Sequence, residues 1–145
     1  YGGDLVSLVR QFNTPENDGC GSAWLIGGGR TTIDANDAPF GYSVVSDGKD
    51  FGTNGQQYEC REETLAHELG HNMGLQHDRD TADGDDNVLQ NNEYGAYAYS
   101  FGYRTAAGGG NFYTVMAYGE SRQTSYRVFS NPRVSGCGGF PCGVV

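Results

Sequence analysis

Residues 67–78 read HELGHNMGLQHD, and the fold prediction starts from them. Side chains four positions apart share a face of an α-helix, so His67 and His71 direct their imidazoles toward one point. Glu68 lies one position round the helix from His67, close enough to act at that point. Gly74 allows the backbone to leave the helix through a left-handed conformation, and the turn can return His77 to the same place.

Three imidazoles with an open fourth position describe a catalytic zinc site, because a structural zinc site is closed by four protein ligands. The open position takes a water whose pKa zinc lowers to about 7, and Glu68 can then accept its proton. The HExxH pattern alone arises by chance on many helices, but Gly74 and His77 follow at the required offsets. All three histidines of the chain fall in this segment. A surface helix with coincidental histidines is therefore a poor explanation.

The surrounding pattern predicts a helix over residues 62–73. Leu65, Leu69 and Met73 recur at four-residue spacing, acidic residues occupy the first turn, and Gly74 ends the helix. Before it, residues 4–9, 22–26 and 42–46 are predicted strands. After it, the chain is loop-like, crowded with Asp, Asn and Gly, until an apolar cluster at residues 112–116. Strands before one long helix, then irregular structure, predict an α+β domain with two unequal lobes.

The segment at residues 4–9 has aliphatic side chains on both faces, as expected of a strand buried on both sides of a sheet. Such a strand seldom lies at a sheet edge. We therefore expect upstream strands to be missing from this chain.

Length and charge restrict the class of protein. With 145 residues the chain fits one domain. Its net charge of −9 would repel phosphate backbones, which argues against nucleic-acid binding. No apolar run approaches the roughly 18 residues of a membrane span, and no basic-then-apolar leader is present.

Four cysteines, without any CxxC pair, predict two disulfides. Of three possible pairings, Cys137–Cys142 is the easiest because both lie in one short Gly-rich stretch, which leaves Cys20–Cys60. Four free thiols in a cytosolic protein are the alternative. Disulfides imply an oxidising compartment, so we expect a secreted, extracellular protein.

The pattern HExxHxxGxxH is the signature of the metzincin zinc metallopeptidases, and this sequence resembles the adamalysin or reprolysin-like branch in a bacterial form. Asp78, directly after the third histidine, is the residue that this branch favours. Further similarity lies at residues 4–6, 20–23, 42–45 and 129–132, so the resemblance covers nearly the whole chain. The sequence is similar to bacterial peptidyl-Asp metallopeptidases as well.

The resemblance implies one catalytic domain over residues 1–145, with a mixed twisted sheet packed on the active-site helix. Residues 1–76 would form the upper subdomain, and residues 77–145 an irregular lower one. Metzincins normally place two strands and a long helix before the segment at which this chain begins, so the upper lobe is expected to be incomplete. In the family, the strand matching residues 22–26 borders the cleft, and an extended peptide would pair with it.

The resemblance also assigns roles to two residues of the apolar cluster and the segment after it. Met116 would be the Met-turn, a hydrophobic floor beneath the metal. Tyr118 stands two residues later, where some metzincins carry a tyrosine that binds zinc or stabilises the tetrahedral intermediate. A buried structural tyrosine is the alternative for Tyr118.

Residues 78–87 offer many carboxylate and amide oxygens, which are the ligands that Ca²⁺ prefers. Their spacing does not match an EF-hand loop. A solvated acidic loop is therefore the favoured interpretation, and a calcium site is the alternative.

Together these features predict a secreted, monomeric, zinc-dependent endopeptidase that acts on proteins and peptides. Glu68 would remove a proton from the zinc-activated water and deliver it to the leaving amine. One alternative is a non-catalytic, zinc-stabilised binding module, which would have no need of Glu68. The other is an inactive fragment of a metalloprotease.

Overall fold

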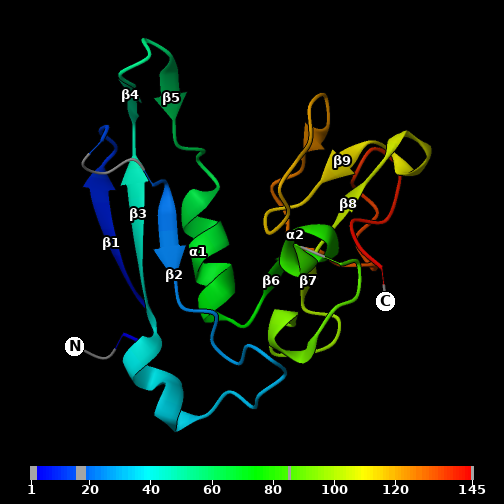
Figure 1. Cartoon of the computed structure of the whole chain (residues 1–145). Coiled ribbons are helices and arrows are strands. Elements are labelled where there is room, and N and C mark those ends of the chain that lie inside the picture. Colours follow the sequence, from blue (N-terminus) through cyan, green and yellow to red (C-terminus); the bar gives the residue numbers. More distant parts are fainter. Residues whose placement is uncertain (1–2, 16–18, 85, 145) are drawn as a thin grey trace.

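The computed structural model describes residues 3–15, 19–84 and 86–144, which contain both helices and strands (Figure 1). A three-stranded sheet comes first, in the order β1-β3-β2. Strand β3 (Tyr42–Asp47) is central, with β1 (Val6–Gln11) parallel to it and β2 (Gly21–Ala23) antiparallel. The 3₁₀-helix η1 (Ala35–Phe40) lies in the connection from β2 to β3.

Helix α1 (Thr64–Asn72) packs against β2 and β3. Asn72, its last residue, donates from Nδ2 to the carbonyl oxygens of Trp24 (3.1 Å) and Tyr42 (3.3 Å). Between β3 and α1 the chain forms a hairpin of β4 (Lys49–Phe51) and β5 (Gln57–Glu59). The hairpin ends directly before Cys60, whose disulfide with Cys20 joins the approach to α1 to the start of β2.

The second part of the chain lies beside α1 in Figure 1 and is built of short elements. Strand β6 (Gln76–Asp78) pairs in parallel with β7 (Phe101–Gly102), and helix α2 (Arg79–Asp83) follows β6 directly. A further sheet has the order β10-β9-β8, with β8 (Arg104–Thr105), β9 (Phe112–Tyr113) and β10 (Thr124–Ser125). The 3₁₀-helices η2 (Asn91–Glu93) and η3 (Ala107–Gly109) complete the described elements.

The buried core of this second part centres on residues 112–117, all of which are buried. Phe112 is fully buried and packs with the Cys137–Cys142 disulfide, against which Tyr103, Tyr126 and Val128 also pack. Met116 is 1% exposed. A Cβ built on Gly70 of α1 would overlap the Met116 sulfur, so the helix meets this core at van der Waals distance.

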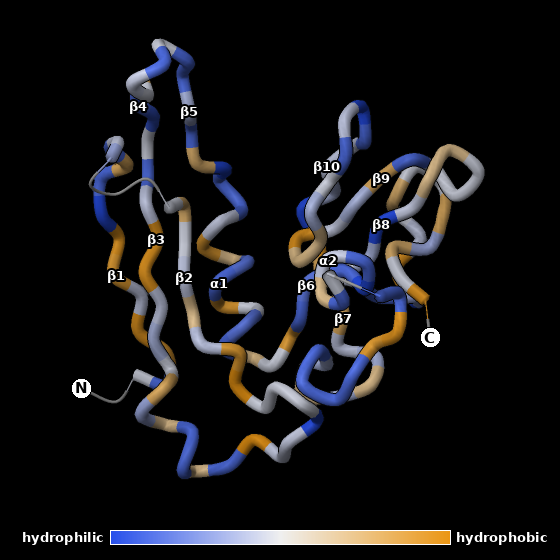
Figure 2. The backbone as a smooth tube through the Cα atoms, viewed as in Figure 1, coloured by the Kyte–Doolittle hydropathy of each residue, from blue (hydrophilic) through white to orange (hydrophobic). Residues whose placement is uncertain are grey.

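The predicted α+β class agrees with this arrangement, and the predicted helix and strands appear with shifted ends. The burial predicted for residues 4–9 is wrong within this chain. Strand β1 lies at the sheet edge, with Val6, Leu8 and Val9 exposed by 64%, 60% and 59%. In Figure 2, hydrophobic stretches (orange) run along β1 and β3. The sequence pattern of residues 4–9 shows only that the side chains are apolar, and no described residue covers them.

The segment predicted as an acidic loop also differs, because part of it forms α2. Asp78 begins this helix, since its carboxylate accepts from the backbone N–H of Thr81. Gly84 ends the helix in a left-handed conformation, at φ +74°. Among the residues that the structure describes, no helix is long and apolar enough to cross a membrane.

Candidate active site

Helix α1 and the turn after it bring the three histidines together. His67 and His71 lie one helical turn apart and are both buried. Gly74 adopts a left-handed φ of +85°, where a Cβ would overlap that of Ala96. The chain then reverses: the N–H of Leu75 donates to the Gly70 carbonyl at 2.9 Å, and β6 carries His77 back. The reversal requires a residue without a side chain at position 74.

The imidazole nitrogens of the three histidines converge on one point. The Nε2 atom of His77 lies 3.1 Å from Nε2 of His67 and 3.1 Å from Nε2 of His71. Their potential ligand atoms all lie within 4.8 Å of one another. A tetrahedral zinc ion with Zn–N bonds of 2.0–2.1 Å requires nitrogens about 3.3 Å apart, so the spacing suits such an ion.

Hydrogen bonds at the Nδ1 atoms of His67 and His71 fix the tautomers of these two rings. Nδ1 of His67 lies 2.8 Å from the carbonyl oxygen of Val115, and Nδ1 of His71 lies 2.9 Å from that of Leu75. A carbonyl oxygen can only accept, so each Nδ1 carries the proton and each Nε2 presents a lone pair. Lone pairs that face one another at this distance repel unless a cation or a proton lies between them. The donor set therefore fits a divalent metal held by nitrogen.

The imidazoles are also in the protonation state that a metal requires. Burial first, and then the neighbouring histidines, lower the pKa of His71 to about 4 and that of His77 to about 4. Burial lowers the pKa of His67 as well. All three rings are thus neutral at pH 7, and no proton has to leave before they bind a metal.

Glu68 lies beside the histidines and is 6% exposed. Burial raises the pKa of its carboxyl to about 7, because the charged form loses hydration there. A Cβ built on Gly21 of β2 would overlap the Glu68 carboxylate, so the absence of a side chain at position 21 makes room for it. A carboxyl group that titrates near neutral pH is suited to accept and return a proton.

Tyr118 lies against this cluster, and Met116 packs against the helix that carries His67 and His71. The Tyr118 ring is half-exposed, with its centroid 4.6 Å from that of His77 and 5.8 Å from that of His67. Partial burial, followed by the charges of Glu68 and Asp78, raises the pKa of its hydroxyl. Met116 lies in the core beneath the helix, against Gly70.

A cleft of about 390 Å³ opens beside His67 and Glu68. Its walls come from the start of β2, the first turns of α1 and the segment that follows Met116. The residues that matter for its chemistry are Gly21, Arg61, His67, Glu68, Tyr113 and Tyr118.

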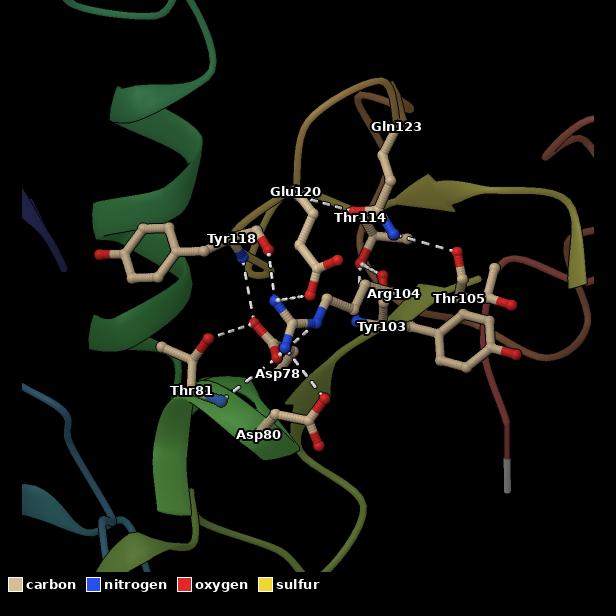
Figure 3. Close-up of polar contacts among 10 residues, drawn as sticks. All are labelled: Asp78, Asp80, Thr81, Tyr103, Arg104, Thr105, Thr114, Tyr118, Glu120 and Gln123. Atoms are coloured by element: carbon tan, nitrogen blue, oxygen red, sulfur yellow. Dashed lines mark hydrogen bonds and ion pairs between the residues drawn. The ribbon is translucent and has the colours of Figure 1, made fainter. Parts of the chain in front are cut away.

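A polar network joins β6, which contains His77, to the segment that contains Tyr118 (Figure 3). The Asp78 carboxylate is 3% exposed and lies 3.2 Å from Nε of Arg104. Arg104 also pairs with Asp80 at 2.9 Å and with Glu120 at 3.5 Å. It donates to the backbone carbonyl of Tyr118 at 3.1 Å. Sequence reasoning missed Arg104, because no local spacing links it to Asp78, which lies 26 positions earlier.

The acidic segment at residues 78–87 is partly occupied by these contacts. Asp78 and Asp80 pair with Arg104, and Asp83 accepts from the backbone N–H groups of Asp86 and Asn87. Asp85 lies outside the described residues. In the described part of the chain, the three histidines are the one group found with three or more potential metal ligands. Calcium binding here stays a prediction.

Comparison with known proteins agrees with the chemistry of this site. The model of the family described as metallo-peptidase family M12B, reprolysin-like, matches residues 1–145. The chain is also 35% identical, over 161 aligned residues, to a peptidyl-Asp metalloendopeptidase of Pseudomonas aeruginosa. That alignment covers 99% of this chain and 23% of the relative, so the chain spans less than a quarter of the relative's length. No solved structure matches the chain. This chain belongs to the M12B, reprolysin-like family of metallopeptidases.

Proposed function

We propose that this chain is a zinc-dependent endopeptidase with a metzincin-like catalytic domain. The observation that carries the proposal is the approach of three Nε2 lone pairs to one point, directly beside a buried carboxyl group. A zinc-stabilised binding module would need the histidines but not the carboxyl. Membership of a metallopeptidase family supports the hydrolytic function.

His67, His71 and His77 would hold the metal through their Nε2 atoms. When bound, zinc would supply Lewis acidity toward the scissile carbonyl and lower the pKa of water in its open position. The Val115 and Leu75 carbonyls keep two of the rings in the required tautomer. We include Ca²⁺ in the proposal as a second ion at residues 78–87, where carboxylates are concentrated.

Glu68 would act as general base and then as general acid. Its pKa of about 7 lets it take a proton from the attacking water at neutral pH and later give it to the leaving amine. The burial that raises this pKa also keeps bulk water from the carboxyl. The two proton transfers restore Glu68 to its starting state, so no covalent intermediate with the protein is required.

Tyr118 would stabilise the oxyanion of the tetrahedral intermediate. Its ring contacts two of the three imidazoles, and its raised pKa keeps the hydroxyl protonated as a donor. Met116 would serve as the Met-turn, because it fills the core directly beneath Gly70 of α1.

Substrates would be extended peptides. Strand β2 is the edge of its sheet, and it borders the cleft at Gly21, so a peptide can add to it through main-chain hydrogen bonds. The relative from Pseudomonas aeruginosa is named a peptidyl-Asp metalloendopeptidase. We extend this to the present chain as a preference for aspartate at the cleavage site.

The cellular setting and organisation follow from other features. Two disulfides, Cys20–Cys60 and Cys137–Cys142, indicate an oxidising compartment, and we propose secretion. We propose a monomer with a catalytic domain over residues 1–145, divided into residues 1–76 and 77–145.

The decisive experiment is cleavage of a quenched casein or peptide substrate with and without chelator. We expect activity that chelation abolishes and zinc restores, and that Glu68→Ala abolishes while zinc content stays the same. Glu62→Ala removes an exposed glutamate just before the same helix and serves as the matched control. A folded, zinc-loaded chain without turnover on any substrate would instead support a binding module or an inactive fragment.

A further inference from the structure

We propose that Arg61 forms the subsite that receives an acidic substrate side chain on the carboxyl side of the scissile bond. The inference rests on the proposed function and identifies the residue that sets its specificity. Arg61 lines the same cleft as His67 and Glu68.

Arg61 is held close to the cleft by covalent and packing constraints. It follows Cys60, whose disulfide partner Cys20 directly precedes β2. Its guanidinium lies over the Tyr113 ring, 5.3 Å from the centroid, and Nη1 donates to the Tyr113 hydroxyl. Tyr113 is itself only 7% exposed, so the group that positions the guanidinium is fixed in the core. Because these contacts position the guanidinium before any ligand arrives, the entropy cost of binding at this part of the cleft is lower.

The guanidinium of Arg61 differs from those of Arg104 and Arg127 in its charge partners. Arg104 pairs with three carboxylates, and Arg127 lies within ion-pair distance of Glu62 and Glu63. In the described part of the chain, no carboxylate lies within 4.0 Å of the Arg61 guanidinium nitrogens. Arg61 therefore retains the capacity to bind a carboxylate, which a guanidinium can do with two parallel hydrogen bonds.

Three glutamates share the walls of this cleft with Arg61. Glu63 lies 3.8 Å from Arg127, which offsets its charge. Glu68 is the carboxyl already proposed to move protons. Glu59 lies on β5 and is exposed, so solvent and salt screen its charge. Arg61 is the only cation among the residues that line this cleft in the described chain.

Antiparallel pairing of the bound peptide with β2, which we adopt here, places Arg61 after the scissile bond. Strand β2 runs from Gly21, which lies against Glu68, toward Trp24, whose carbonyl accepts from Asn72 at the far end of α1. A peptide that pairs antiparallel with β2 runs the opposite way. It passes the histidines first and then approaches Cys20 and Arg61, so its residues beyond the cleaved bond lie nearest the guanidinium.

The test compares peptides that differ only at the residue after the scissile bond, which is Asp, Asn, Leu or Lys. With the 145-residue chain loaded with zinc, we expect higher kcat/KM for Asp than for Asn. Arg61→Gln should lower kcat/KM for the Asp peptide about tenfold or more, the factor of a charge-assisted hydrogen bond, and leave the Asn peptide nearly unchanged. Arg61→Glu should reverse the preference in favour of Lys.

Arg30→Gln is the matched control, because Arg30 also lies over a tyrosine ring, 4.7 Å from Tyr94, but outside the cleft. It should leave the Asp-to-Asn ratio as in the parent chain. A second readout is the Kd of labelled Asp and Asn peptides for the Glu68→Ala chain, with and without Arg61→Gln.

The outcomes separate the two proposals. Cleavage with an Asp-to-Asn ratio that Arg61→Gln does not change would overturn the Arg61 subsite and leave the endopeptidase intact. A parent chain with no preference for Asp would also overturn it. Absence of any chelator-sensitive cleavage would overturn the endopeptidase, and the peptide Kd ratio would still decide whether Arg61 binds the acidic side chain.

Discussion

The Asp78 carboxylate accepts a hydrogen bond from the backbone N–H of Tyr118, with 3.1 Å between Oδ2 and N. Asp78, directly after His77, thus holds in place the segment after Met116, which contains Tyr118. Arg104 strengthens the link, because it pairs with Asp78 and donates to the carbonyl of Tyr118 (Figure 3). The spacing between His77 and the Tyr118 ring therefore depends on this hydrogen bond, which joins residues 40 positions apart, and on the ion pair between Asp78 and Arg104.

Asp78→Asn tests this link. The substitution keeps the shape of the side chain but removes the charge, and it places an amide where two backbone N–H donors require an acceptor. We expect a loss of about 2 kcal/mol in the free energy of unfolding, measured with urea. The loss is limited because Arg104 keeps its two exposed partners, Asp80 and Glu120. Asp80→Asn removes a 75%-exposed partner of the same arginine and should cost less than about 1 kcal/mol. Equal losses in the two variants would contradict a special role for Asp78.

Gly70→Ala tests the contact between α1 and Met116. Alanine normally stabilises a helix interior, but here its Cβ would overlap the Met116 sulfur and lie 3.1 Å from the Phe129 ring. We expect a net loss of about 2 kcal/mol from overpacking, again by urea unfolding. Gly108→Ala is the control, because nothing lies within 4 Å of the Cβ position there. If Gly70→Ala were as stable as the parent chain, the two parts would not pack as tightly as described.

Tyr118→Phe removes the hydroxyl and keeps the ring that contacts His67 and His77. If the hydroxyl stabilises the oxyanion, kcat on a peptide should fall about 100-fold with little change in KM. Tyr97→Phe, at an exposed tyrosine that stacks on Tyr99, should leave both parameters unchanged. An unchanged kcat in Tyr118→Phe would make this residue part of the wall of the cleft and nothing more.

Reducing the Cys20–Cys60 disulfide should affect substrate preference as well as stability. The bond holds Arg61 next to β2, and it closes a long loop across the first sheet. The chain-entropy model gives a loss of roughly 4 kcal/mol for a loop of this length, so we expect Cys20→Ala with Cys60→Ala to lower the midpoint of unfolding strongly. Any residual activity should show a weaker preference for Asp, measured with the same peptide series. A fully retained preference would mean that packing on Tyr113 alone positions Arg61.

The parts of the site that could be predicted from sequence are those with local spacing. His67, Glu68 and His71 share helical positions, and Gly74 marks the turn that returns His77, so one short stretch contained the whole cluster. The helix itself was predictable because its apolar residues recur at the helical period.

The remaining features depend on contacts between distant segments. Arg104 and Asp78 are far apart in sequence, and nothing in the residues around either one indicates that they meet. The pattern of β1 predicts burial on both faces, but whether such a strand is covered depends on which element packs against it. Helix α2 was missed because it is one short turn whose acidic residues also suit a loop, and its stability comes from the Asp78 cap.

The metal-free chain should lose stability on acidification. Its folded state holds the pKa values of His71 and His77 at about 4, and that of His67 below its usual value of 6.5. An unfolded chain would protonate these rings below about pH 6.5, so their contribution to stability is complete above that pH and is lost as the pH falls toward 4.

Glu68 has the opposite effect on stability as the pH falls, because its pKa rises from 4.5 to about 7 on folding. Between about pH 6.5 and 4.5 the folded chain therefore holds one proton that the unfolded chain has released, against the two or three imidazole protons that only the unfolded chain holds. The histidines dominate, and the net free energy of unfolding should fall as the pH is lowered. Urea unfolding in chelator from pH 7.5 to 4.5 measures this slope. His71→Gln combined with His77→Gln should flatten it, and an unchanged slope in that variant would show that other groups cause the acid sensitivity.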